Sequence, residues 1–459
     1  MTTPGATSAD PTRRLPTPIC LSFGIGTVGV SIVLNTVSVY FPALMSTVLG
    51  ISPAIAGAMV TASKLYDIVV DVIIGGASDR TQSRWGRRRP FLLAGALTSF
   101  GALLMIFVAP ELEGAALMVY MSAALIVYST GYALFNVPYL AMPSEMTDGY
   151  HQRLHLISYR TAFVGIGQLL SLAVTAALID YGGGGASGYR LMGVVMAVLA
   201  LISMLVCFFG TAGARTVARG EHGLGFNWAG VKSLAGNRPL VMLMGAKLTQ
   251  YIAFGIMQPA NLLFLLNVLK TGYTGMVHMS AVQNIAVFAS MPIWVRLGRR
   301  FGKRNCYMAA VVIMIPACLS WYWTAPGIPM WEIWVRAAVF GFGSGGSLLM
   351  STSMLPDAMH YDRQRAGFHR EGIVASIYCI NEKLGFAVGA LVLGAALSAG
   401  GYVPTTGGAI IDQAPAAIDA LFAVKAFIPA AALACGLIMI WRYDLDQRAV
   451  DGSIATARA

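Results

Sequence analysis

The chain contains little charge for its length. Of its 459 residues, 11% are charged and 57% are hydrophobic, whereas about 25% of the residues of an ordinary soluble domain are charged. A soluble core of this size does not need so little charge. The composition therefore excludes a soluble globular protein and indicates a polytopic membrane protein.

Residues suited to metal, redox or nucleic-acid chemistry are sparse as well. The six cysteines form no Cys-x-x-Cys pair and the six histidines form no clustered ligand set, so we expect no disulfide and no metal site. No basic stripe with interleaved aromatic residues accompanies the net charge of +11, so no nucleic-acid partner is expected. Because no nucleotide motif or catalytic Ser/His/Asp or Cys/His order is present, we expect neither an enzyme nor a cofactor.

Long apolar stretches dominate the chain instead. Each is about 18–28 residues long, enough for a helix to cross the ~30 Å of hydrocarbon in a bilayer. They predict an all-α membrane protein with twelve transmembrane helices, at 19–41, 53–77, 91–109, 115–141, 157–179, 190–210, 238–267, 275–297, 306–325, 331–355, 371–398 and 416–441. No apolar region with a cleavage site precedes the first stretch, so no cleavable signal peptide is expected.

A polar stretch between the sixth and seventh spans divides the chain into two halves. The predicted parts are an N-terminal tail (1–18), a six-helix bundle (19–210), a central loop (211–237), a second six-helix bundle (238–441) and a C-terminal tail (442–459). Most of the 31 basic residues fall in the two tails and the even-numbered connections. Because basic residues accumulate in cytoplasmic loops, we expect a multi-pass inner-membrane protein with both termini in the cytoplasm.

Two aspartates lie within the second apolar stretch. Asp67 and Asp71 are four residues apart and so share one face of a helix, and Lys64 extends the same stripe. A carboxylate at the bilayer centre costs at least ~2.5–3.5 kcal/mol, and such residues face a protein interior or a water-filled cavity. Two carboxylates so close need a cation or a proton between them. The pair therefore predicts an ion-coupling site, with a structural ion pair to Lys64 or Lys383 as the compatible alternative.

A short motif recurs at equivalent places in the two halves. Trp85–Arg88 follows the second span, and Phe301–Arg304 follows the eighth. Both are an aromatic residue, a glycine and two basic residues. Parallel six-helix halves joined by a central cytoplasmic loop are the architecture of major facilitator transporters.

The sequence resembles the glycoside–pentoside–hexuronide:cation symporters, the family of melibiose permease within the major facilitator superfamily. The resemblance rests on the loop that begins at Gly75 and runs through Asp79-Arg80-TQSRWGRRRPF, on the Asp-x-x-x-Asp pair of the second span, on the stretch 132–139 (YALFNVPY) and on the region 355–386, which contains Lys383. It covers essentially the whole chain. The family implies cation-coupled symport of a sugar by alternating access.

The resemblance also implies roles for particular residues. Asp67 and Asp71 match the aspartates that bind the coupling cation, and Lys383 matches the lysine of the eleventh span. Other sodium ligands do not match, because Val70 and Ala133 replace polar residues. We therefore expect a proton in preference to sodium as the coupling ion.

Sugar-binding positions of the family differ in this chain too. Ser31 and Asn136 stand where the family has aspartates, and Arg160 matches an arginine of the fifth span. Asn136 can donate to and accept from hydroxyls, although an interhelical hydrogen bond is the alternative. Tyr132 lies one turn away on the same face and is suited to a sugar ring. Arg160 is either a substrate or gating group or a positive-inside anchor.

The remaining candidates lie in the second half, apart from Lys64 of the second span. Tyr378 and Lys64 complete the predicted substrate-binding set. Glu382 precedes Lys383, and because neighbours on a helix point ~100° apart, we expect one of the two to face the cavity. Lys247, Arg336 and Lys425 are further intramembrane cations that spacing alone does not place.

The leading hypothesis is a monomeric proton- or sodium-coupled symporter of a sugar or glycoside that contacts the lipid bilayer. Transport of a lipid or other amphipathic solute is the alternative, because the sugar aspartates are replaced. A non-transporting scaffold or sensor is a third hypothesis, against which the costly intramembrane charges argue.

Overall fold

The computed structural model describes residues 16–147, 150–214, 236–366 and 371–443, and within them the secondary structure is helical apart from one isolated β-bridge. The helices of the first half are α1 (Thr17–Ala43) with the π-helical turn η1 (Leu44–Val48), α2 (Pro53–Arg80), α3 (Arg89–Phe107), α4 (Gly114–Met146), α5 (Tyr150–Leu169) continued by η2 (Leu170–Val174) and α6 (Thr175–Tyr181), and α7 (Ala186–Gly210).

The helices of the second half are α9 (Arg238–Asn267), α10 (Gly272–Phe301), α11 (Lys303–Leu319) with the 3₁₀ turn η3 (Ser320–Trp323), α12 (Met330–Ala366), α13 (Glu371–Ala399), and α14 (Pro415–Phe422) continued by η4 (Ala423–Phe427) and α15 (Ile428–Trp441).

Eleven segments of the described chain are long and apolar enough to cross a membrane, and each corresponds to a predicted span. The predicted second span, α2, is 28 residues long but carries five charges, so it is too polar to be recognised by hydropathy. The all-α membrane fold with twelve spanning helices is confirmed. The polar span is the one that carries the predicted coupling residues.

Local sequence signals explain where several helices begin. Pro53 occupies the first turn of α2, where its missing N–H costs nothing, and the Ser52 side chain accepts a hydrogen bond from the backbone N–H of Ile55. Pro239 has the same place in α9, after Asn237, whose side chain accepts from the N–H of Leu240 at 3.1 Å. The π-helical turns within the first, fifth and twelfth spans were not predicted.

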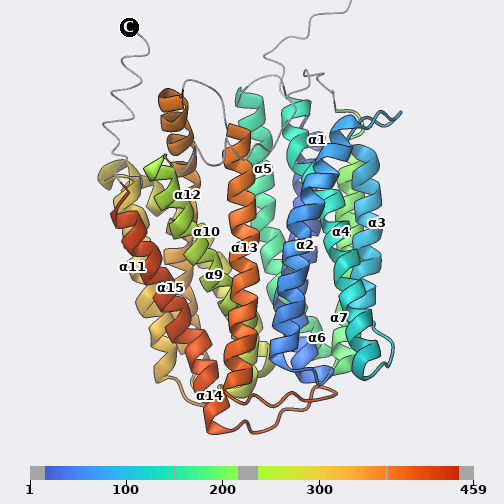
Figure 1. Ribbon diagram of the computed structural model, residues 1–459, viewed down its shortest axis with the longest axis vertical. Helices are drawn as coiled ribbons and strands as arrows, with labels where there is room; N and C mark the ends of the chain where they lie inside the picture. The colour runs from blue at the N-terminus through green and yellow to red at the C-terminus, as the bar shows by residue number, and fades with distance from the viewer. Residues whose placement is uncertain (1–15, 148–149, 215–235, 367–370, 444–459) are drawn as a thin grey trace, which may run out of the picture.

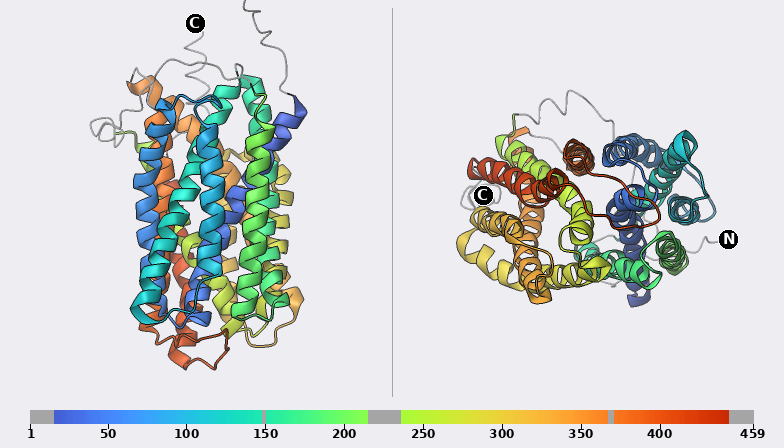
Figure 2. Two further views of the ribbon diagram at one scale, coloured as in Figure 1. Left: turned by 90° about the vertical axis from the view of Figure 1, so that its right-hand side faces the viewer. Right: turned by 90° about the horizontal axis from the view of Figure 1, so that it is seen from below.

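The spanning helices run roughly parallel to one long axis (Figure 1). The described chain begins and ends at the same end of the bundle, the upper end in Figure 1, which we call the terminal end; the opposite end is the distal end. Seen from the distal end, the helices of the first and second halves form two groups side by side (Figure 2, right).

The boundaries of the tails and of the central loop remain predictions. Residues 1–15, 215–235 and 444–459 lie outside the described chain, and they make up most of these three segments.

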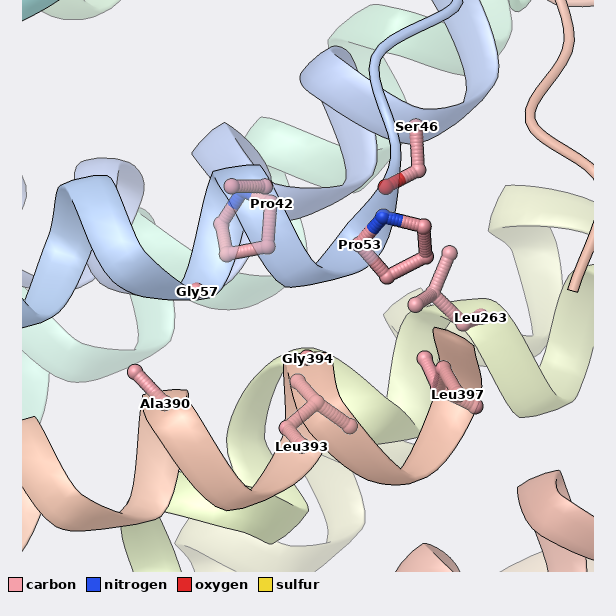
Figure 3. A pocket seen from close by; sticks show the side chains of 10 residues that line it. Pro42, Ser46, Pro53, Gly57, Leu263, Ala390, Leu393, Gly394 and Leu397 are labelled. Carbon is pink, nitrogen blue, oxygen red and sulfur yellow. The ribbon is translucent and has the colours of Figure 1, made fainter. Parts of the chain in front are cut away.

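Close helix packing joins the two halves through α2 and α13. Near the distal end, Pro53 and Gly57 of α2 face Ala390 and Gly394 of α13 (Figure 3). A Cβ on Gly57 would lie 2.5 Å from the backbone oxygen of Ala390, and one on Gly394 would lie 2.4 Å from that of Pro53. Glycine is therefore required at both positions for the backbones to approach this closely. Farther along, the Thr61 hydroxyl donates to the backbone oxygen of Ala387 at 2.9 Å.

The connection between α13 and α14 crosses the distal end and contacts the first half. We call residues 401–414 the distal strap. Its backbone N–H groups at Thr405, Gly407 and Gly408 donate to the carbonyl oxygens of Ser46, Val48 and Thr47 at 2.8, 2.9 and 2.9 Å. The strap runs beneath the first-half helices in Figure 1. The distal end of this structure is therefore closed by contacts between the halves.

Candidate transport site

An ion pair joins the two halves at the predicted coupling site. Nζ of Lys383, on α13, lies 2.6 Å from Oδ2 of Asp71, on α2. The same Nζ donates to the backbone oxygen of Asp67 at 3.1 Å. The lysine and Asp71 side chains are 15% and 26% exposed, so the pair is mostly desolvated. The cross-half pairing predicted for Lys383 is present.

The second aspartate is paired within its own helix. Oδ2 of Asp67 lies 3.3 Å from Nζ of Lys64, and both side chains are buried. The Lys64 ammonium also lies 5.4 Å from the centre of the Tyr128 ring of α4. The other oxygen of each carboxylate makes no hydrogen bond. Both of these oxygens, Oδ1 of Asp67 and Oδ1 of Asp71, are buried. These two oxygens can accept a proton or a cation.

The charged side chains of four helices lie at a common depth. Asp71, Arg160, Lys247 and Glu382 are each 9–11 residues from the terminal end of their helix. At 1.5 Å per residue this corresponds to about 14–17 Å along each helix. We call these four residues the central layer.

Glu382 precedes Lys383 on α13 and was given no site role from the sequence. Its carboxylate interacts electrostatically with cations of both halves, Lys64, Arg160, Lys247 and Lys383. α13 packs against both α2 and α9. Neighbouring residues that point ~100° apart can therefore both border the central region. Lys383 reaches α2, and Glu382 interacts with Lys247 of α9. That one of the two faces a central cavity stays a prediction.

Aromatic hydroxyls border the same acidic group. Tyr132, on α4, is buried and lies within electrostatic range of Glu382, Asp67 and Asp71. On the opposite side, the Tyr251 hydroxyl donates to that of Tyr378 at 2.9 Å. Both of these tyrosines are also within range of Glu382. The predicted candidates Tyr132 and Tyr378 therefore both interact electrostatically with Glu382.

Lys247 belongs to the site through a buried polar network of the second half. Its Nζ donates to Oε1 of Gln250 at 2.9 Å and lies 4.5 Å from the centre of the Tyr251 ring. Gln250 in turn donates to Ser347 at 2.6 Å and accepts from the Tyr307 hydroxyl at 3.1 Å. These bonds hold Lys247 beside the central layer. The only sequence signal for it was a lysine within an apolar span.

The substrate candidates of α4 and α5 lie in the first half. Arg160 is half-buried on α5, within range of Glu382 and of Tyr139, and its Nε is buried without a hydrogen-bond partner. Asn136 is half-buried on α4, one turn from Tyr132. Ser31 is buried where α1 packs closely against α5. A Cβ on Gly167 of α5 would lie 2.6 Å from the Cβ of Ser31.

Two of the unplaced cations lie within the second bundle, apart from the central layer. Arg336 forms an ion pair with Glu332 of its own helix, at 2.7 Å. Lys425, in the π-helical turn η4, donates to the side chain of Asn261. The Lys425 ammonium lies 4.2 Å from the centre of the Trp321 ring, and the Arg336 guanidinium 5.7 Å from it. These two residues therefore stabilise packing against Trp321.

The surroundings of the aspartates offer few oxygen ligands. Val70 and Ala133 are buried together with Ile74 in a small apolar cluster beside α2 and α4. Sodium needs several oxygen ligands around it, whereas a proton needs a single carboxylate oxygen. The apolar cluster therefore removes candidate sodium ligands from this side of the aspartate pair.

The sequence matches the family model described as MFS/sugar transport protein over residues 22–447. The chain belongs to this family. It is accordingly a multi-pass membrane transport protein of the major facilitator type and not an enzyme.

Relatives of known name extend over nearly the whole chain. A glucuronide carrier protein homolog of Escherichia coli is 24% identical over 93% of this chain and 92% of its own length. A putative glycoside/cation symporter of the same organism is 25% identical over 94% and 92%. The solved structure of a bacterial homologue of the human drug peptide transporters PepT1 and PepT2 has a TM-score of 0.67 at 14% identity, covering 93% of this chain and 97% of its own. At that identity it shows the fold alone.

Proposed function

We propose that this protein is a cation-coupled symporter of a sugar or glycoside, acting as a single chain in the cell's inner membrane with both termini in the cytoplasm. The observation that carries the proposal is the Lys383–Asp71 ion pair, because it joins the two halves between two spanning helices, and solute sites of such transporters lie where the two halves meet. The names of the relatives, a glucuronide carrier homolog and a glycoside/cation symporter, support the substrate class.

The ion pair couples a cation to the movement of the halves. While Asp71 is ionised, Lys383 holds α13 against α2. A proton on Asp71 removes half of the pair, because a neutral carboxyl group attracts the ammonium weakly. The desolvated lysine then loses its counter-ion, so the contact between α2 and α13 is weakened. These two helices also pack against each other at the distal end. Binding of the cation therefore favours the rearrangement that exposes the site to the other side.

A proton is the proposed coupling ion. The buried, unpartnered Oδ1 atoms of Asp67 and Asp71 are positions where it can reside. Val70 and Ala133 provide no side-chain oxygen beside them. Asn136 and Tyr132 then remain to bind sugar hydroxyls from α4.

Reconstituted proteoliposomes test the proposal. Labelled sugars and glycosides are added outside while either an inward proton gradient or an inward sodium gradient is imposed. We expect at least one sugar to accumulate with the proton gradient, and a protonophore to abolish the accumulation. Folded protein that neither binds nor accumulates any of these solutes with either gradient would contradict the proposed function. Accumulation with sodium alone would contradict the choice of ion only.

A further inference from the structure

A tyrosine of the second half is buried against the first half at the distal end. Tyr273 is the second residue of α10 and is 6% exposed. Its hydroxyl donates to the backbone oxygen of Gly184 at 3.1 Å and lies 3.4 Å from the hydroxyl of Tyr189, on α7. The two tyrosine rings meet edge to face, with 6.3 Å between their centres. Tyr273 therefore makes both a polar and an aromatic contact across the halves.

The partner of Tyr273 is a run of four glycines. Residues 182–185, which we call the glycine turn, join α6 to α7 at the distal end (Figure 1). Gly184 has a φ of +75°, in the left-handed region that favours glycine, and a Cβ there would lie 3.4 Å from the Tyr273 ring. Because a side chain at this position would strain the backbone, glycine is what allows the turn to present its carbonyl oxygen to Tyr273.

The same turn also contacts the distal strap. A Cβ on Gly185 would lie 2.5 Å from the backbone oxygen of Gly407, and a Cβ on Gly408 would lie 2.6 Å from Cα of Gly185. Backbones can approach this closely only where side chains are absent. Two segments of the second half, the strap and the start of α10, thus meet on one turn of the first half.

The strap and Tyr273 are attached to the same part of the second half. Asn267, the last residue of α9, donates to the hydroxyl of Tyr402 in the strap at 3.2 Å, and both side chains are buried. The Gln413 amide, near the end of the strap, exchanges two hydrogen bonds of 2.9 Å with the backbone of Val403. The strap is therefore closed on itself and joined to the helix that leads into α10.

We propose that Tyr273 and the glycine turn form a latch that closes together with the strap and holds the distal end shut. The inference goes beyond the proposed function, because it holds for any solute. The strap contacts the first half mainly through backbone hydrogen bonds. Tyr273 adds a buried aromatic ring, whose exposure to water is unfavourable. The latch therefore lowers the fraction of the protein that can receive a solute from the distal side.

Amide hydrogen exchange of the strap tests the inference without a solute. The N–H groups of Thr405, Gly407 and Gly408 donate to the first half in the closed distal end, and they exchange with solvent when it opens. Mass spectrometry of the peptide that contains them follows this exchange in purified full-length protein in lipid nanodiscs. We expect Tyr273→Phe to accelerate the exchange about threefold, because the hydroxyl contact is lost. Tyr273→Ala, which also loses the ring, should accelerate it 10-fold or more.

Gly185→Ala tests the latch from the first half. Gly185 has a φ of −95°, which alanine can adopt, so the added methyl group would act on Gly407 of the strap. We expect the strap amides to exchange 10-fold or more faster. Two matched controls should leave the exchange within about twofold. Tyr40→Phe removes a tyrosine hydroxyl that donates to a backbone oxygen within the first half, that of Leu172. Gly101→Ala adds a methyl group where no neighbouring atom lies within 4 Å.

The outcomes separate the latch from the proposed function. Thermal unfolding shows which variants are folded. Unchanged exchange of the strap in every folded variant of Tyr273 and Gly185 would overturn the latch and leave sugar symport standing. Equal acceleration by Tyr40→Phe and Tyr273→Phe would also overturn it, because the loss of any tyrosine hydroxyl would then loosen the distal end. The expected exchange in a protein that neither binds nor accumulates a sugar would contradict the proposed function alone.

Discussion

Nζ of Lys383 lies 2.6 Å from Oδ2 of Asp71 and 3.1 Å from the backbone oxygen of Asp67. One cation of the second half thus contacts two successive turns of α2 in the first half. Of the two acceptors, the carboxylate of Asp71 can be protonated, whereas the backbone oxygen of Asp67 cannot. Loss of the charge on Asp71 therefore weakens the attachment without abolishing it, which suits a step that must reverse in every transport cycle.

Removal of the lysine should impair coupled uptake. We expect Lys383→Ala to lower gradient-driven accumulation 10-fold or more, because Asp71 is left without its counter-ion. The loss of a positive charge also favours the protonated carboxyl group, so the pH of half-maximal uptake should move upward. Uptake into proteoliposomes over a range of pH measures both effects. Unchanged uptake and pH profile would show that the pair has no part in coupling.

Lys270→Ala is the matched control for this experiment. Lys270 pairs with Asp412 at 2.7 Å, but the two side chains are 54% and 89% exposed. The hydrogen bond and the charge of the lysine hold the pKa of Asp412 below its usual range. Because solvent and salt screen such a surface pair, its removal should leave uptake within about twofold.

Neutral replacements of the aspartates should separate coupling from folding. Asp67→Asn and Asp71→Asn are each expected to abolish accumulation against a gradient, since each removes a site for the coupling ion. Counterflow, which needs no driving ion, should be retained in part. Gradient-driven uptake and counterflow measured on the same vesicles make the comparison. Wild-type accumulation by both variants would contradict the coupling role.

A double-mutant cycle should show that the cross-half pair is a unit. Lys383→Met alone leaves the mostly desolvated Asp71 unpaired and should destabilise the protein by about 3–5 kcal/mol at most. Addition of Asp71→Asn should recover part of that loss, because no unpaired charge remains. Thermal unfolding in detergent provides the measurement. Additive losses would mean that the two side chains do not interact in the membrane-extracted protein.

The distal strap offers a way to lock one conformation. Leu49 and Thr406 form an isolated antiparallel bridge between the halves, so their Cα atoms lie at a separation that a disulfide can span. Oxidation of a Leu49→Cys/Thr406→Cys variant should abolish uptake, and reduction should restore it. Each single variant, treated in the same way, is the control. Full uptake by the oxidised double variant would show that the distal end need not open.

The sequence predicted much of the architecture from apolar run length alone. All twelve spans were predicted in this way, the second included, although its charges make it too polar for a hydropathy window. The π-helical turns could not be predicted, because they differ from the α-helices that they continue in backbone hydrogen bonding and not in a recognisable side-chain pattern. The strap could not be predicted either, since its partners are backbone groups some 350 residues away.

The site was predictable only where charge patterns lie within one helix. Asp67, Asp71 and Lys64 share one face of α2, and Lys383 was identified through the resemblance to a symporter family. The place of Glu382 depends on α13 packing between α2 and α9, which no local pattern reveals. Lys247 likewise needed the tertiary structure, because its polar partners come from other turns and other helices.

The distal strap has a consequence for the energetics of opening. The carbonyl groups of Ser46, Thr47 and Val48 belong to the last turn of the first span, where helix carbonyls have no donor within the helix. The N–H groups of Thr405, Gly407 and Gly408 serve as the cap of that helix, supplied by the other half of the chain. When the halves separate at this end, the three oxygens lose these donors. Water must then donate to them, because each oxygen left unsatisfied costs about 1–3 kcal/mol. The rate of opening should therefore depend on how readily this end is hydrated, and so on the lipid and osmolyte that surround it.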